Sequence, residues 1–235
     1  MENHETNATY PTALLVAFEG IDGSGKGTQA RRLQEHLAAQ GRKAALISFP
    51  RYEETLFGRA VGEFLNGRFG SLDEVDPFLV SLLYAGDRFE SRGWLTDALA
   101  ENDVVVLDRY VASNIAHQGA KRNGDARDEL IDRIQKIEYG LYQLPRPNLV
   151  LLLDLPVAEA QKLIAVKSAR SYTDRKADLQ EADADYLQRV RDVYLSLADN
   201  HPDWYRIDSV RGDTLRTVEE IAGEIVERLT PLLKA

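Results

Sequence analysis

The sequence predicts a single α/β domain in which helices cover both faces of a five-stranded parallel sheet. Five short apolar runs of strand length alternate along the chain with longer segments of helical periodicity, and this alternation is typical of a doubly wound sheet. The runs carry almost no polar residues, as expected of strands that are covered on both faces. A length of 235 residues suits one such domain.

The expected strands begin after a polar segment at the start of the chain. Residues 1–12 are predicted to form a flexible N-terminal tail, so the domain would span residues 13–235. Strands are then expected at residues 13–18, 44–49, 104–107, 149–153 and 204–207, where the apolar runs lie. Together these runs predict the five strands of the sheet.

Helices are expected between these strands. Residues 29–40 repeat apolar side chains at helical spacing and are followed by Gly41, which suits the position after a helix. Helical stripes then cover residues 56–99. A new start is expected at Asp76-Pro77, where an N-cap acid precedes a proline at the first helical position.

The second half of the chain contributes four further expected helices. The first carries an apolar stripe of Leu130, Ile134, Ile137 and Leu141. The second opens at Pro156, the third covers residues 186–197, and the last is expected to be capped by Asp213. Between the second and third of these helices, residues 167–176 form a basic segment with the composition of a turn.

Composition excludes several classes of function. The net charge is −9 and no basic face is apparent, so nucleic-acid binding is not expected. The chain has no cysteine, which excludes disulfides, thiolate zinc sites and thiol nucleophiles. No apolar run has the length of a signal-peptide core or a membrane span, so a cytoplasmic protein without a membrane partner is expected.

A glycine-rich turn between the first strand and the first helix carries the strongest functional signal. Glycines there let backbone N–H groups close around a polyphosphate, and a lysine can reach its terminal phosphates. The residues expected to bind these phosphates are Gly20, Asp22, Gly23, Ser24, Gly25, Lys26, Gly27 and Thr28. The pattern G-x-x-x-x-G-K-[ST] fails only at its last position, Gly27, since the hydroxyl comes one residue later at Thr28.

Two further strands end in an acid, and in phosphate-loop proteins such an acid often holds Mg²⁺ directly or through water. Asp154 is interpreted as the cap of the following helix rather than as a metal ligand. Asp108 is interpreted as a magnesium residue, because Arg109 follows it and the two could manage metal and phosphate together. A purely structural ion pair between them is the alternative.

Four segments of the chain resemble thymidylate kinases, a family of P-loop nucleoside monophosphate kinases. They are the phosphate loop with Asp22 inside it, Phe49-Pro50-Arg51-Tyr52, Tyr84-Ala85-Gly86-Asp87-Arg88, and the run from Asp108 to Asn114 followed by Gln118-Gly119-Ala120. The resemblance covers about residues 13–230 and implies a P-loop kinase fold with a short mobile lid. It also implies ATP-dependent phosphorylation of dTMP to dTDP with Mg²⁺, for dTTP supply in DNA synthesis, usually in a homodimer.

The resemblance implies a set of residues that bind the acceptor. Arg88 and Asn114 match positions that meet the two edges of the base, Tyr84 and Phe49 match aromatic positions beside the nucleoside, and Asp22 matches an acid at the sugar 3′-hydroxyl. The full set is Asp22, Phe49, Arg51, Tyr52, Tyr84, Arg88, Arg109, Asn114, His117 and Gln118. His117 lies where many members have tyrosine, which weakens the prediction of deoxyribose over ribose.

The catalytic residues implied are cationic. The acceptor is a phosphate monoester that is largely ionised near neutral pH, so transfer needs positioning and charge neutralisation rather than a strong base. Lys26 would bind the donor phosphates and Arg109 the acceptor phosphate, while Asp108 and Thr28 are the expected metal residues. Members of the family carry a further catalytic arginine either in this loop or in a mobile lid. Because loop positions 22–24 hold no arginine here, the resemblance implies one in a lid at about residues 167–178. The two candidates in that lid are Arg170 and Arg175, with Lys167 in support.

Three other functions compete with this interpretation. The loop Gly25-Lys26-Gly27-Thr28 also resembles that of adenylate kinases, so another nucleoside monophosphate kinase is one alternative. A deoxynucleoside kinase is a second, since Glu19 could act as the base that its hydroxyl acceptor would need. A nucleotide-dependent switch is a third, but no Asn-Lys-x-Asp segment for guanine recognition is present.

Overall fold

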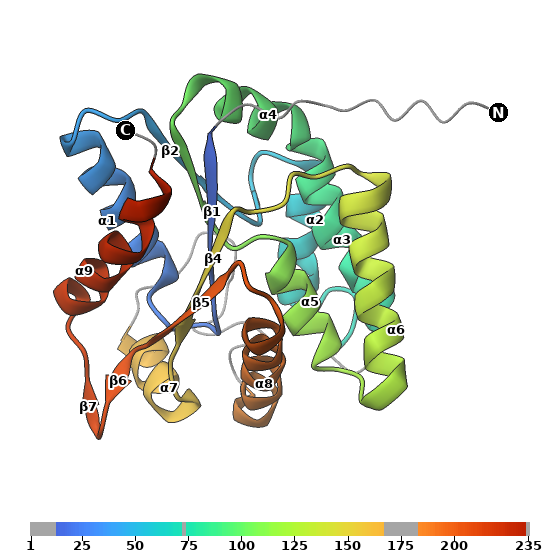
Figure 1. Cartoon of the computed structure of the whole chain (residues 1–235). Coiled ribbons are helices and arrows are strands. Elements are labelled where there is room, and N and C mark those ends of the chain that lie inside the picture. Colours follow the sequence, from blue (N-terminus) through green and yellow to red (C-terminus); the bar gives the residue numbers. More distant parts are fainter. Residues whose placement is uncertain (1–12, 72–73, 167–182, 234–235) are drawn as a thin grey trace.

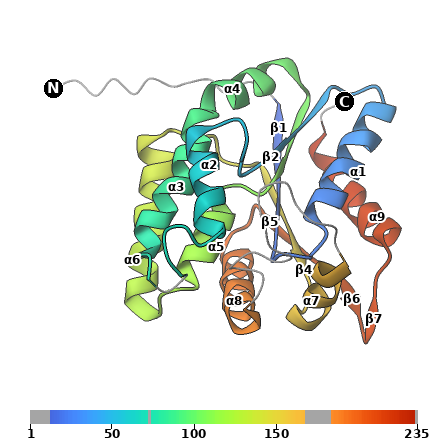
Figure 2. The ribbon, with the colours of Figure 1, turned by 180° about the vertical axis from the view of Figure 1, so that it is seen from behind.

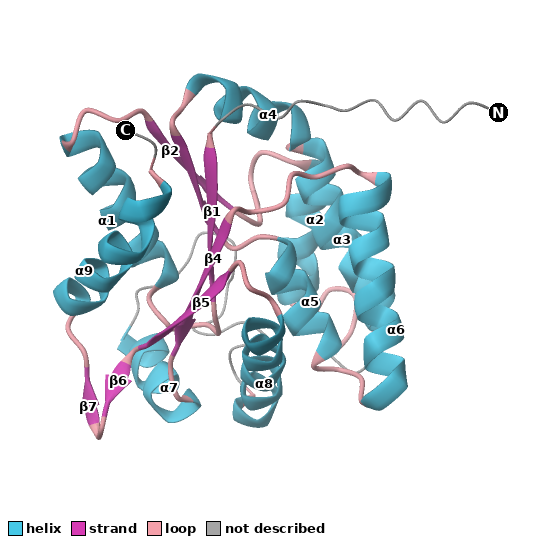
Figure 3. Ribbon diagram, in the orientation of Figure 1, coloured by secondary structure: helices cyan, strands magenta, loops and turns pink. Residues whose placement is uncertain are grey.

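The computed structural model describes residues 13–71, 74–166 and 183–233. Its centre is a five-stranded parallel sheet in the order β2-β3-β1-β4-β5, which confirms the predicted sheet (Figures 1 and 3). The strands are β1 (Leu14–Glu19), β2 (Ala44–Ser48), β3 (Val104–Asp108), β4 (Leu149–Asp154) and β5 (Trp204–Asp208). The predicted N-terminal tail at residues 1–12 and lid at about 167–178 lie outside the described residues.

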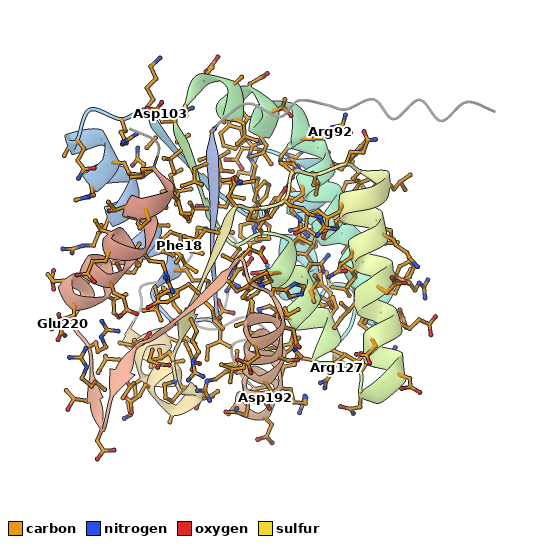
Figure 4. The ribbon with its side chains drawn as sticks, viewed as in Figure 1. Phe18, Arg92, Asp103, Arg127, Asp192 and Glu220 are labelled. Atoms are coloured by element: carbon orange, nitrogen blue, oxygen red, sulfur yellow. The ribbon has the colours of Figure 1, made fainter. Side chains whose placement is uncertain are left out.

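Two layers of helices enclose the sheet, because successive strand residues point to opposite faces and both sets are apolar. One face packs against α1 (Lys26–Ala39) and α9 (Val218–Leu229), with Phe18 fully buried between them and the sheet (Figure 4). The other face packs against α4 (Arg92–Glu101), α5 (Val111–Gly119) and α8 (Ala184–Asn200). Figure 2 shows the same layers from behind.

The remaining helices, with one exception, extend the second layer. They are α2 (Leu56–Leu65), α3 (Pro77–Glu90), α6 (Gly124–Gln135), the π-helix η1 (Lys136–Leu141) and α7 (Val157–Val166). The exception is the 3₁₀ helix η2 (Thr230–Leu232), which continues α9 in the first layer. A small separate core of Val61, Phe64, Leu65 and Val80 joins α2 to α3. The helices α2 and α3 therefore form a small unit beside the central sheet, with apolar contacts of their own. None of the described helices has the length and apolar character needed to span a membrane.

Several predicted helix ends are confirmed by their local geometry. Gly41 has φ +79° immediately after the end of α1, a left-handed conformation that glycine adopts without strain. The carboxylate of Asp76 accepts a hydrogen bond of 2.8 Å from the backbone N–H of Phe78, which caps α3 at the predicted start.

Two expected boundaries are wrong. The stripe over residues 56–99 breaks again at Ser91, whose hydroxyl donates to the carbonyl of Asp87 at 2.8 Å and competes with the helical pattern. The last helix begins at Val218, not after Asp213. Gly212-Asp213 is instead the two-residue turn of a hairpin made by β6 (Val210–Arg211) and β7 (Thr214–Leu215).

The cap of α9 comes from Thr217 instead. Its hydroxyl accepts a hydrogen bond from the backbone N–H of Glu220, and the Glu220 carboxylate accepts one of 2.8 Å from the backbone N–H of Thr217. This reciprocal capping box satisfies donors that a helix start otherwise leaves free. The sequence Thr-x-x-Glu was the signal that the prediction overlooked.

The apolar stripe predicted from Leu130 to Leu141 is only half correct. Leu130 and Ile134 are buried, but Leu141 is 73% exposed and Glu138 is fully buried. The reason is the π-helix η1, whose wider turn changes which residues face inward after Gln135. A carboxylate thus enters the interior where an apolar residue was expected.

Candidate active site

A cavity of about 1140 Å³ lies beyond the C-terminal ends of β1, β2 and β3, the edge at which open α/β sheets bind ligands. It brings together residues that are far apart in the sequence. The predicted site residues that line it are Asp22, Gly23, Ser24, Gly25, Lys26, Gly27, Thr28, Phe49, Tyr52, Tyr84, Arg88, Asp108, Arg109, Asn114, His117 and Gln118. Gly20 and Arg51 are not in its lining, and Arg170 and Arg175 lie outside the described residues.

The phosphate loop needs its glycines for two reasons. Gly20 has φ +139°, and a Cβ there would lie 2.6 Å from the carbonyl oxygen of Leu153, so no larger residue fits. Gly25 has φ +91° and leads directly into α1, whose N-terminal N–H groups face the cavity edge. Gly20 therefore has a structural role in the loop rather than a place at the cavity surface.

Lys26 lies inside this loop. Its Nζ donates to the carbonyl of Ile21 at 2.8 Å and lies 3.5 Å from the hydroxyl of Ser24. Burial, together with the positive charge of Arg109, lowers the pKa of Lys26 to about 7. The lysine is thus held at the centre of the loop, next to the groups that would receive a polyphosphate.

Gly27, the departure from the strict loop pattern, has a physical explanation. A Cβ at this position would lie 2.8 Å from Oδ2 of Asp108, at the end of β3. Glycine therefore leaves room for the Asp108 carboxylate beside the first turn of α1, within the cavity that Thr28 also lines. The first turn lacks a hydroxyl at residue 27 because a carboxylate occupies that space.

Arg109 connects the phosphate loop to α5. Its Nη2 pairs with Oδ1 of Asp22, and its Nη1 donates to the hydroxyl of Ser113 at 3.1 Å. Burial alone would lower the pKa of Arg109, but nearby carboxylates, Asp22 first, hold it well above its ordinary value. The ion pair that holds this arginine is thus made with Asp22 and not with the neighbouring Asp108. Its backbone has φ +66°, an uncommon conformation for a residue other than glycine.

Glu19, the base that a deoxynucleoside kinase would need, is fully buried behind the loop. Its carboxylate accepts hydrogen bonds from the backbone N–H of Tyr110 at 2.8 Å, the hydroxyl of Ser113 at 2.6 Å and the hydroxyl of Tyr194 at 2.9 Å. Burial raises its pKa. Glu19 does not line the cavity, so its contacts assign it to the support of the loop after β3.

Asp154 does not have its predicted role. Its carboxylate accepts two hydrogen bonds from Arg191, at 2.6 and 3.0 Å, and pairs with Arg206 at 2.8 Å. It therefore joins β4 to α8 and β5 instead of capping α7. The side chain is nearly buried and lies outside the cavity lining, which also speaks against a metal at this acid.

Arg51, which was expected to bind the acceptor, is not among the residues that line the cavity. Its guanidinium lies 4.1 Å from the centre of the Trp94 ring and donates to the hydroxyl of Ser91 at 3.2 Å. Its backbone N–H donates to buried Asp87 at 3.0 Å, and Asp87 also accepts from Thr55. These contacts pack the segment after β2 against α3 and α4, and the predicted role of Arg51 at the acceptor stays a prediction.

Behind the part of the cavity wall formed by Arg88 and Asn114 lies an ion pair that sequence reasoning missed. Arg88 donates to both carboxylate oxygens of Glu138, through Nε at 2.6 Å and Nη2 at 2.5 Å. Asn114 donates to the same carboxylate at 2.8 Å. In the sequence, Glu138 is a lone acid at the border of the apolar stripe from Leu130 to Leu141. A regular helical repeat gives no reason to expect its burial.

His117 presents an acceptor to the cavity. The hydroxyl of Tyr186 donates to the His117 carbonyl at 2.9 Å, so the 3.1 Å contact between that hydroxyl and Nδ1 requires a hydrogen on Nδ1. The other ring nitrogen, Nε2, then carries a lone pair and can accept a hydrogen bond. It is buried without a hydrogen-bond partner among the described residues. Burial and the charge of Arg109 lower the pKa of His117 to about 3, so the ring stays neutral near pH 7.

Comparisons with known proteins agree with this architecture. A family model described as thymidylate kinase matches residues 18–221. The chain is 34% identical over 185 residues to the thymidylate kinase of Mycobacterium tuberculosis, covering 79% of this chain and 86% of that protein. It is 32% identical over 218 residues to a probable thymidylate kinase of Thermococcus onnurineus, covering 91% and 95%.

A solved structure extends the likeness to three dimensions. The thymidylate kinase of Candida albicans superposes with a TM-score of 0.74 at 25% identity, covering 94% of this chain and 92% of that one. The family model spans all the loops that form the cavity, from the phosphate loop to the start of α9. The chain therefore belongs to the thymidylate kinase family.

Proposed function

We propose that this enzyme transfers the γ-phosphoryl group of ATP to dTMP, giving ADP and the dTDP from which dTTP is made for DNA synthesis. The observation that supports this most is the single cavity that joins a phosphate loop to a buried set of polar groups on α3 and α5. One end suits the donor phosphates. The other offers the hydrogen-bonding groups that a pyrimidine requires.

Charge neutralisation is the main catalytic contribution of the described residues. Lys26 binds the β- and γ-phosphates of the donor, and Arg109 binds the acceptor phosphate across the same space. Because the acceptor oxygen is already ionised, no described side chain needs to remove a proton. Asp22 holds Arg109 in place and meets the sugar 3′-hydroxyl, so the loop contacts both substrates.

Magnesium is the proposed metal, and the residues present fit it. Asp108 places one carboxylate against the first turn of α1, and Thr28 adds a hydroxyl at the same end of the cavity. No cluster of three histidine, aspartate or glutamate side chains suited to a metal occurs in the described part of the chain. This suits Mg²⁺, which commonly uses one or two carboxylates together with substrate phosphates, and which would draw charge away from the reacting phosphates.

A lid arginine completes the proposed site. Arg170 and Arg175 are the candidates, in a lid of about residues 167–178 outside the described residues. Closing such a lid would exclude water from the γ-phosphate. Comparison of Arg170→Ala with Arg175→Ala identifies the catalytic one by a fall in kcat. Equal, unchanged kcat values in both variants would remove a lid arginine from the mechanism.

The burial of Glu19 argues against the deoxynucleoside kinase alternative, since that reaction needs a base at the cavity. The experiment is ADP release with dTMP, dUMP, thymidine, AMP and the ribose analogue of dTMP offered separately. We expect the highest kcat/KM with dTMP. Turnover of thymidine without turnover of dTMP would overturn the proposed function, and preference for AMP would indicate an adenylate-type kinase.

A homodimer in the cytoplasm is the proposed working form. The family resemblance supports the dimer, and α3 leaves Leu79 57% and Phe89 48% exposed, large apolar side chains that a partner could cover. A chain without cysteine suits a reducing compartment.

A further inference from the structure

Asn114 is fixed in one orientation by its neighbours. Its Nδ2 lies 3.0 Å from the carbonyl oxygen of Ser81 and 2.8 Å from Oε1 of Glu138. Both neighbours are acceptors only, and the amide NH₂ is the only part of Asn114 that can donate to them. The side-chain carbonyl must therefore point the other way.

That carbonyl is an unsatisfied acceptor. Asn114 is 1% exposed, and its Oδ1 is buried without a hydrogen-bond partner among the described residues, although Asn114 lines the cavity. Leaving a buried acceptor unpaired is unfavourable, so such a group at a cavity wall is suited to a ligand donor. This end of the cavity therefore presents a fixed acceptor that suits an N–H group of a ligand.

Arg88 is fixed by the same carboxylate. Glu138 engages the edge made by Nε and Nη2, which leaves Nη1 and the second hydrogen of Nη2 as donors on the remaining edge. Burial alone would lower the pKa of Arg88, but the attraction of Glu138 holds it above its ordinary value, so the guanidinium stays charged. Arg88 also lines the cavity.

We propose that Glu138 is a positioning residue that determines which pyrimidine the enzyme accepts. By binding the Asn114 amide and one edge of Arg88, it presents an acceptor and a charged donor side by side to the base. This inference rests on the proposed function, because it takes a pyrimidine monophosphate as the acceptor substrate.

The resulting pattern distinguishes the pyrimidines by chemistry. Thymine and uracil offer an N3–H donor beside a C4 carbonyl acceptor, which complements Asn114 Oδ1 and Arg88. Cytosine offers an N3 lone pair beside a C4 amino donor, so both contacts become repulsive. Sites built to hydrogen-bond one pattern reject the opposite one strongly, since buried polar groups are then left unpaired.

The test is the Glu138→Gln variant, assayed with dTMP, dUMP and dCMP. Glutamine keeps the shape but has one acceptor oxygen in place of two and no charge, so it holds Arg88 and the Asn114 amide less firmly and weakens the pattern that rejects cytosine. We expect the ratio of kcat/KM for dTMP over dCMP to fall at least about tenfold. The ratio for dTMP over dUMP should stay within about twofold, because those bases share N3–H and C4 carbonyl and differ by one methyl group.

The second ratio separates positioning from a loosened fold. A cavity that merely loosens would discriminate less well both against the missing methyl group of dUMP and against the exchanged hydrogen-bonding groups of dCMP. A parallel fall in both ratios would therefore overturn the proposal. No change in either ratio would also overturn it. Glu129→Gln, the same substitution at an exposed residue of α6, is the matched control and should change neither ratio. KM for ATP should be unchanged in both variants.

Failure of the proposed function and failure of this inference give different results. If the wild-type protein does not phosphorylate dTMP, the proposed function is wrong. If the wild-type protein phosphorylates dTMP but Glu138→Gln leaves both ratios unchanged, the inference about Glu138 is wrong. If Glu138→Gln does not fold, Asn114→Ala removes the acceptor while leaving the Arg88–Glu138 pair. Its dTMP over dCMP ratio must then fall, and an unchanged ratio would overturn the proposal.

Discussion

Single buried charges determine the chemistry of the cavity. Lys26 and Arg88 are buried and Arg109 is largely buried. Lys26 is held by a carbonyl of its own loop, whereas each arginine is held by a carboxylate from a distant part of the chain. Burial disfavours the charged form of all three side chains, but only the pKa of Lys26 falls near neutrality, to about 7. The two arginines remain charged because carboxylates face them.

The lowered pKa of Lys26 predicts that ATP binding takes up a proton. Negative phosphates raise the pKa again in the complex, so Lys26 gains close to one proton on binding at pH 8 and close to none at pH 6. ATP affinity should therefore fall as the pH rises through 7. Calorimetry in buffers of different ionisation enthalpy measures this uptake.

Lys26→Arg provides the control for that measurement, since an arginine stays protonated throughout. Proton exchange by ATP itself is common to both proteins and cancels in the difference. Equal uptake in wild type and variant at pH 8 would show that Lys26 is already charged in the free enzyme.

Arg109→Ala should lower kcat by about 10²–10³-fold, a loss typical of one removed transition-state contact. Steady-state kinetics give kcat, and a fluorescent ATP analogue gives the dissociation constant, which should change by less than about threefold. Arg109→Lys, which keeps the charge but not the forked geometry, should fall between wild type and Arg109→Ala. Loss of ATP binding in Arg109→Ala would place this arginine at the donor instead.

At the residue scale, the sequence predicted the composition of the site better than its pairings. The phosphate-loop residues and those of α5 line the cavity because strand ends and helix starts bring them there. The partner of Arg109, by contrast, depends on how two loops face each other, which no local pattern determines. The same limit applies to Arg51, which packs on Trp94 after a turn whose direction is set by tertiary contacts.

At the element scale, α2 and α3 approach each other closely at one glycine. A Cβ on Gly86 would lie 2.5 to 2.7 Å from ring atoms of Phe57 in α2. The segment after β2 is held to α3 by the same approach, since Asp87 beside this glycine accepts from Arg51 and Thr55. Close contact between these helices therefore supports the cavity wall that Tyr84 and Arg88 provide.

Gly86→Ala should therefore destabilise the protein, by about 1–3 kcal/mol as expected for overpacking. Gly223 in α9 is the matched control, because a Cβ there meets nothing within 4 Å. Gly223→Ala should stabilise by about 0.5–1 kcal/mol, the usual gain of alanine over glycine in a helix. Urea unfolding measures both, and changes of the same sign would contradict the packing described between α2 and α3.

Strands were more predictable than the irregular elements. All five strands of the sheet lie within two residues of their expected bounds, because fully covered strands are apolar throughout. The π-helix η1 could not be anticipated, since its sequence fits a regular helix and the partner of Glu138 within it, Arg88, lies 50 residues away along the chain. The hairpin at Gly212-Asp213 could have been predicted from its turn residues.

At the scale of the whole molecule, the prediction concerns the oligomeric state of the protein. If the proposed homodimer forms, light scattering after size exclusion should give about twice the 26.4 kDa of one chain. The mass should hold over a range of micromolar concentrations, since obligate interfaces are extensive and apolar. A mass of one chain throughout that range would contradict the dimer.

The central claim is that one cavity carries out transfer between two bound phosphates. Phosphorus NMR of the enzyme with ATP, Mg²⁺ and dTMP tests it most directly, because it identifies the product. The predicted result is growth of the paired α- and β-phosphate signals of dTDP in step with ADP. Release of inorganic phosphate with dTMP left unchanged would show that the enzyme hydrolyses ATP, and would contradict the claim.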